Sequence, residues 1–171
     1  TDRHGLNPTS SNALGDAASD GFNFWKFWHG KGCVFLFEWA LMTVFTKIIS
    51  GDLPGHFVCR DEKAVAFLSI NPIRPGHTLV VPAEEVSHWV DLDEETNAHL
   101  MKMAHRVAKA QMKVFSPERV GLIIAGFEVP HTHLHVVPID SEGQLSFAHA
   151  AKTVDHEQLK KIAEELSKAL S

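Results

Sequence analysis

The sequence predicts an α+β domain with a mainly antiparallel five-stranded sheet, one long helix and a C-terminal helix. Two observations support this fold class. Short apolar runs bounded by turn residues recur through the middle of the chain, and helical apolar periods cover residues 93–115 and 155–170. Strand runs grouped around one central helix favour an antiparallel sheet over alternating βα units. At 171 residues, the chain is long enough for one sizeable core.

Residues 1–41 differ in pattern from the rest of the chain. Residues 1–20 are rich in Gly, Ser, Asn, Asp and Ala and have no apolar period, which is typical of a disordered or non-native segment. Residues 22–41 are rich in Phe and Trp, but charged residues interrupt them too often for a membrane-spanning helix or a signal peptide. We therefore expect an N-terminal extension at 1–41, a folded domain at 42–171, and no membrane insertion.

The elements of the expected domain follow from apolar spacing and from turn residues. The three expected helices cover residues 44–50, 93–115 and 155–170; Gly51 closes the first, and Asp91 and Asp93 are candidates to cap the second. Apolar runs bounded by polar, Gly or Pro residues predict strands at 57–60, 64–70, 77–81, 120–126 and 131–138.

Charge and cysteine content exclude some classes of protein. The formal net charge is −5, with 16 basic and 21 acidic residues and no basic block, so binding to nucleic-acid phosphates is not expected. The two cysteines, Cys33 and Cys59, form neither a C-x-x-C pair nor a repeated spacing. They predict no disulfide framework and no cysteine zinc site, and a reduced cytoplasmic setting is the expectation.

Three histidines alternate at His131, His133 and His135 within the last expected strand. In a β-strand this spacing places the three imidazoles on one face, because side chains alternate between faces. His131 and His135 would then lie roughly 13 Å apart at their Cα atoms. Such an extended row fits one zinc ion poorly and a phosphate with its leaving group better.

A neutral imidazole is a nucleophile near neutral pH, and its neighbours can donate N–H groups to phosphate oxygens. The row therefore favours chemistry at phosphorus. Two other interpretations stay open. An HxH pair of the row could bind a metal with a distant third ligand, such as His77 or Glu128, or the histidine-rich face could carry no chemistry.

The sequence resembles the histidine triad (HIT) family. The run HTHLHVVP matches the pattern H-φ-H-φ-H-φ-φ except for Thr132, and the segments FTKIISGDLP and AFLSINPIRPGHTLVVP match the family's two other recognisable segments in order and spacing. The resemblance implies a HIT-like fold and generally a homodimer. It also implies binding of purine nucleotides and cleavage at the α-phosphate through a covalent nucleotidyl-histidine, with no catalytic metal and no cofactor.

The resemblance also assigns roles to residues. It makes His133 the nucleophile, with His131 and His135 contacting phosphate and leaving-group oxygens, and it places His77 near the nucleophile, in support of the charged imidazole. The residues expected around the nucleotide are Ile48, Phe67 and Ile70 at the base pocket, Ser69 and Asn71 beside them, and Glu128 near the phosphate.

Two departures from the family pattern affect the expected substrate. Ser69 stands where members commonly have an acidic residue suited to ribose hydroxyls, and a serine lacks that charge. Residues 125–130 replace a polar glycine-rich loop, and an ionised Glu128 there would repel a phosphate. The expected substrate is a phosphoramidate or dinucleoside polyphosphate, with a nucleotide- or partner-binding module of weak activity as the alternative and a metal-dependent hydrolase third.

Overall fold

The computed structural model describes residues 42–153 and 155–170, so the predicted extension at 1–41 lies outside the described residues. The described part contains three α-helices: α2 (Val44–Ser50), α3 (Glu94–Phe115) and α4 (His156–Ala169). The strands are β1 (Phe57–Arg60), β2 (Ala64–Leu68), β3 (Thr78–Pro82), β4 (Arg119–Ile124) and β5 (Leu134–Ile139). Short 3₁₀ turns follow β3 and β5: η2 (Trp89–Asp91), η3 (Glu142–Gln144) and η4 (Phe147–His149).

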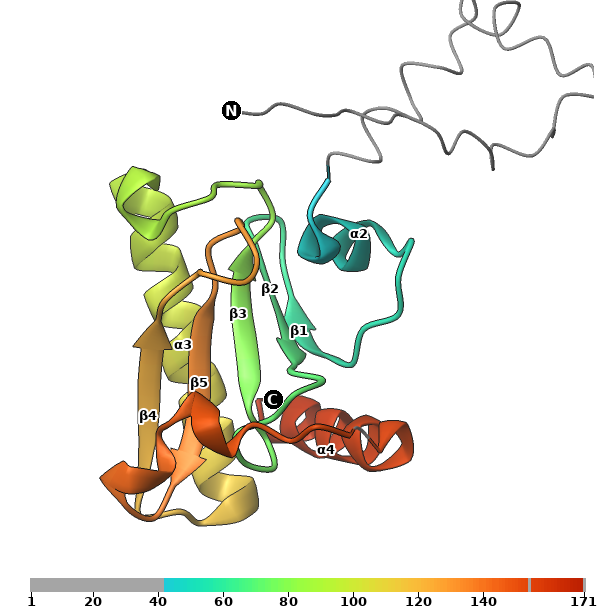
Figure 1. The fold of residues 1–171 in the computed structure, drawn as a ribbon, viewed down its shortest axis with the longest axis vertical. Coiled ribbons are helices and arrows are strands. Elements are labelled where there is room, and N and C mark those ends of the chain that lie inside the picture. The colour runs from blue at the N-terminus through green and yellow to red at the C-terminus, as the bar shows by residue number, and fades with distance from the viewer. Residues whose placement is uncertain (1–41, 154, 171) are drawn as a thin grey trace, which may run out of the picture. The chain divides into compact units, whose positions relative to one another are not determined.

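The five strands form one sheet in the order β1-β2-β3-β5-β4, and every neighbouring pair is antiparallel. Figure 1 shows α3 running along the sheet, with α2 and α4 at the side of β1. The predicted α+β class and five-stranded sheet are therefore confirmed.

The two faces of the sheet have separate cores, because successive side chains of a strand point in opposite directions. Ala64, Ala66 and Leu68 of β2 join the core that α3 and α4 cover. Val65 and Phe67 of the same strand pack instead with Phe45 of α2. The short helix α2 thus covers the face opposite to α3, and any site between α2 and the sheet is walled by apolar residues.

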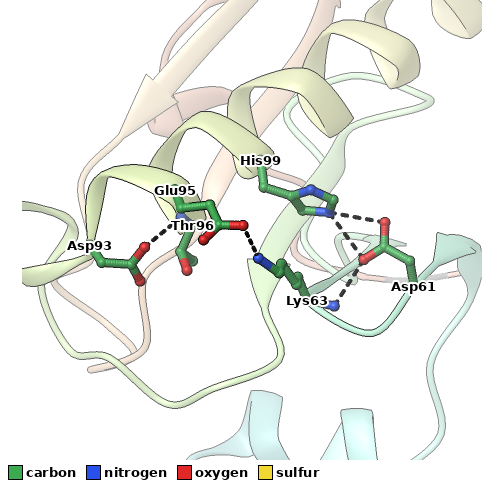
Figure 2. Close-up of polar contacts among 6 residues, drawn as sticks. All are labelled: Asp61, Lys63, Asp93, Glu95, Thr96 and His99. Carbon is green, nitrogen blue, oxygen red and sulfur yellow. Dashed lines mark hydrogen bonds and ion pairs between the residues drawn. The ribbon is translucent and has the colours of Figure 1, made fainter.

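The β1–β2 hairpin is tied to the start of α3 by polar contacts at the surface (Figure 2). Asp61 accepts hydrogen bonds from the backbone amides of Lys63 and Ala64 and from Nε2 of His99 on α3. Lys63 also pairs with Glu95, and Asp93 caps the helix by accepting from the amide of Thr96. These contacts fix the hairpin turn against the first two turns of α3.

A buried glutamine joins α3 to the strands that carry the histidines. Gln111 is fully buried, and its Nε2 donates to the carbonyl oxygens of Gly76 at 2.9 Å and of Val136 in β5 at 3.0 Å. Gly76 has φ of 87°, and a Cβ there would lie 2.4 Å from the ring of Phe115. The turn before β3 therefore needs glycine, and Gln111 holds that turn in place.

The histidine segment is not one continuous strand, which corrects the prediction of a strand beginning at residue 131. Strand β5 begins at Leu134, whose partner on β3 is Val80. Before it, the amide of His131 bonds to the carbonyl of Val129 and the amide of Thr132 bonds to the carbonyl of Val86. Because these amides bond within a turn and to a loop, His131 and His133 lie outside the sheet ladder. The rings of both residues still pack on Phe45 of α2.

Among residues 42–153 and 155–170, no helix combines the length and apolarity that crossing a bilayer requires.

Candidate active site

A cavity of about 430 Å³ opens on the α2 face of the sheet and contains two of the triad histidines. Its walls come from α2, from the loop that leads into β1, from β2 and β3, and from residues 128–135. The lining includes Phe45, Ile48, Leu53, His56, Phe67, Ser69, Ile70, Asn71, Leu79, Glu128, His133, His135 and His156. The cavity is thus apolar along α2 and β2 and bordered by imidazoles.

The strand register explains why distant residues meet at this cavity. Leu79 of β3 pairs with His135 of β5, and Phe67 of β2 pairs with Leu79. Residues paired across an antiparallel sheet point to the same face, so these side chains form a row across three strands. Ile48 of α2 lies above this row, and Gly55 makes room for it, because a Cβ at Gly55 would lie 2.6 Å from Cγ2 of Ile48. The row provides a floor for a flat ligand.

The backbone sets the proton position of His133. Its Nδ1 lies 2.7 Å from the carbonyl oxygen of His131, and a carbonyl can only accept, so Nδ1 carries the proton. In the neutral ring Nε2 then has a free lone pair. Phe45 packs edge-to-face on the same ring, with centroids 5.0 Å apart. His133 is therefore oriented with an unprotonated nitrogen available for attack.

A second chain of hydrogen bonds sets the proton position of His135. The amide of Ile73 donates to Nδ1 of His77 at 3.1 Å, so the proton of His77 lies on Nε2. That nitrogen lies 3.0 Å from Nδ1 of His135 and donates to it. The proton of neutral His135 therefore lies on Nε2, where it can be donated to a ligand. His133 and His135 thus present a nucleophile and a hydrogen-bond donor, with ring centroids 4.7 Å apart.

Burial keeps these imidazoles neutral. It lowers the pKa of His77 to about 3 and that of His135 to about 4, and the neighbouring histidines add to both shifts. Burial also lowers the pKa of His133, although the carbonyl of His131 and the charge of Glu128 oppose this shift. At neutral pH the rings can therefore act as nucleophile and donor without first losing a proton.

His131 is not among the described residues that line the cavity. It is fully buried, its Nε2 donates to the carbonyl of Pro82 at 2.9 Å, and its Nδ1 accepts from the hydroxyl of Thr43 at 3.1 Å. The amide of Thr43 in turn donates to Glu85, which also accepts from the hydroxyl of Thr46. His131 therefore fastens the start of α2 to β3, and it acts on the site through Phe45 and Ile48 of that helix.

Most of the other predicted site residues do meet in one place. Besides His133 and His135, the cavity is lined by the six residues expected around the nucleotide: Ile48, Phe67, Ser69, Ile70, Asn71 and Glu128. His77 does not line the cavity; it bonds to His135 from behind and lies close enough to His133 for the two charges to interact. Glu128 is exposed at the end of the cavity that holds His133.

Some residues of the site were not identified from the sequence. His56 and His156 line the cavity although they lie 100 residues apart, and no local motif connects them. Thr43 and Glu85 also act through contacts between distant segments. Gln111 did have a local signal, because it is a polar residue on the apolar stripe of the long helix.

Within residues 42–153 and 155–170, no group of three or more His, Cys, Asp or Glu side chains is arranged to hold a metal ion. The open hypothesis of an HxH metal site with His77 or Glu128 therefore gains no support from the described residues. His77 and His131 in particular have their ring nitrogens in protein hydrogen bonds.

Comparison with known proteins identifies relatives of this chain. An uncharacterized HIT-like protein of Borreliella burgdorferi is 33% identical over 132 residues, which span 72% of this chain and 95% of that protein. The adenosine 5'-monophosphoramidase of Schizosaccharomyces pombe is 30% identical over 130 residues, 72% of this chain and 95% of that enzyme.

The fold also matches solved structures of this group. A Hit-like protein involved in cell-cycle regulation from Bartonella henselae superposes with a TM-score of 0.65 at 29% identity, over 74% of this chain and 95% of that one. The family model described as "HIT domain" matches residues 50–142, which include His77 and the triad. The chain therefore belongs to the HIT domain family.

Proposed function

We propose that this protein is a nucleotidyl hydrolase or transferase that cleaves a purine nucleoside 5'-phosphoramidate, or a related nucleotide conjugate, at its α-phosphate. The observation that carries the proposal is the complementary state of two neighbouring rings, an unprotonated Nε2 on His133 and a protonated Nε2 on His135. A similar relative, the S. pombe enzyme, is named for the phosphoramidase reaction, which supports this substrate class.

In the proposed reaction, the lone pair of His133 Nε2 forms a bond to phosphorus, and the phosphorus–nitrogen bond of the substrate breaks. The leaving amine departs neutral after taking a proton from solvent. His135 donates its Nε2–H to a phosphate oxygen and keeps that proton, because Nδ1 of its ring is occupied by His77. Water then attacks phosphorus and releases a proton to solvent. The bond to His133 breaks, its electron pair returns to Nε2 of the neutral ring, and nucleoside monophosphate leaves.

His133→Asn tests this proposal directly. We expect the variant to release no adenosine monophosphate from adenosine 5'-phosphoramidate, and to keep the circular dichroism spectrum and melting temperature of the parent within a few degrees. Mass spectrometry of the parent protein, quenched during turnover, should detect a nucleotidyl adduct that the variant lacks. Unchanged turnover in His133→Asn would sink the proposal.

A nucleotide-binding module with little activity is the second candidate, and Glu128 favours it. The carboxylate lies at the His133 end of the cavity, where a substrate would carry its phosphate, and charge repulsion there opposes binding of an anion. A module of this kind would bind adenosine monophosphate in calorimetry and leave a panel of phosphoramidates and phosphoric anhydrides uncleaved.

We also propose that the functional unit is a homodimer. Strand β4 is the last strand of the sheet, and its outer edge has no partner strand among the described residues. Leu122 on this edge strand is an exposed apolar side chain, and Met101 and Met112 are exposed on α3. Free sheet edges and exposed apolar side chains favour pairing with a second copy. Light scattering at micromolar concentration checks this, and a monomer there would contradict it.

Finally, we propose that residues 42–171 carry the activity without the first 41. Among the residues that the structure describes, those that line the cavity all follow residue 43, and the family match begins at residue 50. A chain starting at Met42 should keep the kcat/KM of the parent protein within about twofold, a small change on the free-energy scale of catalysis.

A further inference from the structure

A second pair of imidazoles borders the same cavity. His56 precedes β1 and His156 is the first residue of α4; Nε2 of His56 lies 3.2 Å from Nδ1 of His156, and the ring centroids are 5.5 Å apart. His56 is half-buried, and both rings contribute to the lining. The segment that supplies His156 lies beyond residue 142, where the family match ends.

The strand register shows how far this pair lies from the reacting histidines. His135 is opposite Leu79, Leu79 is opposite Phe67, and Phe67 is opposite Phe57, the residue after His56. Three strand spacings separate His135 from Phe57, which is about 14 Å. If a nucleotide is held with its phosphorus at His133, the end of the nucleotide furthest from the phosphate therefore lies nearest to His56 and His156.

The position of the pair is fixed by both elements that carry it. The amide of Leu68 donates to the carbonyl of His56 and holds that residue beside the end of β2. Helix α4 buries Leu159, Ile162 and Leu166 in the core, and Asp155 caps its first turn. The two rings are therefore part of the cavity wall.

The contact between the rings defines what the pair can bind. In a hydrogen bond between two neutral imidazoles one ring donates and the other accepts, so one of the two remaining nitrogens is a donor and the other an acceptor. Burial and the charge of His156 both lower the pKa of His56, which keeps the pair from becoming doubly charged. A donor and an acceptor side by side complement a neutral polar edge better than an anion. Two imidazoles alone are also fewer than the three protein ligands of a catalytic zinc site.

Between the two histidine pairs the cavity is apolar. Ile48, Leu53 and Phe67 line this stretch, and such walls hold an aromatic ring by its faces. The polar edge of such a ring gives up its hydrogen bonds to water on binding, so it needs hydrogen-bond partners at the end of the cavity.

We propose that His56 and His156 bind the hydrogen-bonding edge of the purine and set the base selectivity of this protein, a role that rests on the proposed function. The donor of the pair would bind a ring nitrogen or a carbonyl oxygen of the base, and its acceptor would bind an exocyclic amino group. These exocyclic groups distinguish adenine and guanine from unsubstituted purine. Ribose hydroxyls are the other neutral group within a nucleotide, and the test separates the two.

Calorimetry on the full chain tests the proposal with adenosine, guanosine, 2'-deoxyadenosine and unsubstituted purine riboside 5'-monophosphates. The unmodified protein should bind adenosine or guanosine monophosphate about tenfold or more tighter than purine riboside monophosphate, as sites built on hydrogen bonds do. His56→Ala and His156→Ala should each remove most of this difference in affinity, because they weaken the binding of adenosine and guanosine monophosphates and leave that of purine riboside monophosphate unchanged. His156→Asn keeps a hydrogen-bond donor and an acceptor at this position, so it should retain part of the difference in affinity that His156→Ala removes.

His105→Ala, on the exposed side of α3, is the matched control and should leave every affinity unchanged. An unchanged ratio in both alanine variants, or no preference in the unmodified protein, would overturn the proposal. So would a loss confined to the difference between adenosine and 2'-deoxyadenosine monophosphates, because the pair would then bind ribose. Base selectivity without any phosphoramidate turnover would overturn the proposed reaction and leave this inference standing.

Discussion

His77 and His135 are joined by a hydrogen bond of 3.0 Å, and the other ring nitrogen of His77 accepts from the amide of Ile73. A backbone amide thus determines, through one buried ring, which nitrogen of His135 faces the cavity with a proton. His77 is a positioning residue, because its own side chain does not line the cavity.

His77→Phe keeps the ring volume but removes the acceptor for Ile73 and the donor to His135. We expect kcat for the phosphoramidate to fall about a hundredfold, with a smaller change in KM, because the donor on His135 loses its fixed position. Nitrogen NMR of the imidazoles should show His135 shifting toward the other tautomer. The control His105→Phe should change neither kcat nor the His135 spectrum. A lower kcat in His77→Phe with an unaltered His135 spectrum would show that the tautomer of His135 is not the cause.

Folding stability should decrease as the pH falls from about 6.5 toward 4. The pKa of His77 is about 3 and that of His135 about 4, both below the ordinary 6.5 that applies in the unfolded chain. Below pH 6.5 the unfolded chain therefore binds more protons, and acid favours it. At pH 5 each of these two rings lowers the free energy of unfolding by about 2 kcal/mol relative to a pH well above 6.5.

Urea unfolding at pH 7, 6 and 5 measures this loss, and calorimetry should detect proton uptake on unfolding near pH 5.5. Carboxylates titrate at lower pH, so this window reports mainly the histidines. A free energy of unfolding that is constant between pH 7 and 5 would contradict the assigned neutral rings.

Glu128→Gln removes the carboxylate at the His133 end of the cavity. Binding of adenosine monophosphate should tighten about fivefold at low salt, because the repulsion between two anions is lost. Glu142→Gln changes the net charge equally but lies away from the cavity, and it should leave the affinity unchanged. If Glu128→Gln instead lowers kcat and does not tighten binding, the carboxylate is an acid that serves the leaving group.

Gln111→Leu replaces the buried amide that bridges α3 to Gly76 and Val136 with a side chain of similar size. The two carbonyl oxygens lose their donor, and we expect a loss of about 1–3 kcal/mol in the free energy of unfolding. Urea denaturation measures it, with the exposed Lys109→Ala on the same helix as the control. A difference below about 0.5 kcal/mol, typical of surface substitutions, would show that the bridge contributes little.

Apolar spacing and turn residues predicted the fold well. The predicted helix at 44–50 and strand at 57–60 have the same bounds in the structure. The helix predicted at 93–115 begins at Glu94 in the structure, because Asp93 is its N-cap. These elements depend on local periodicity and capping, which a sequence displays directly. The start of β5 was wrong because its pairing depends on β3, which is distant in the sequence.

The site was only partly predictable, for the same reason. Motif resemblance identified His133 and His135, but the hydrogen bonds of His131 to Thr43 and Pro82 arise only when α2 and β3 come together. The pair of His56 and His156 likewise requires α4 to pack beside β1. The local sequence pattern does not show which distant segments pack together, so the direction in which the buried ring of His131 points could not be predicted.

The proton positions of His133 and His77 are set by a carbonyl and an amide of the main chain, groups that nearly every amino acid carries. Replacing the side chain at residue 73 would leave that amide available, provided that the turn keeps its shape. The residues that we propose to contact the base would do so through side chains, which can change one at a time. A single substitution can therefore alter the proposed base contacts, while the main-chain groups that set the proton positions of His133 and His77 stay in place.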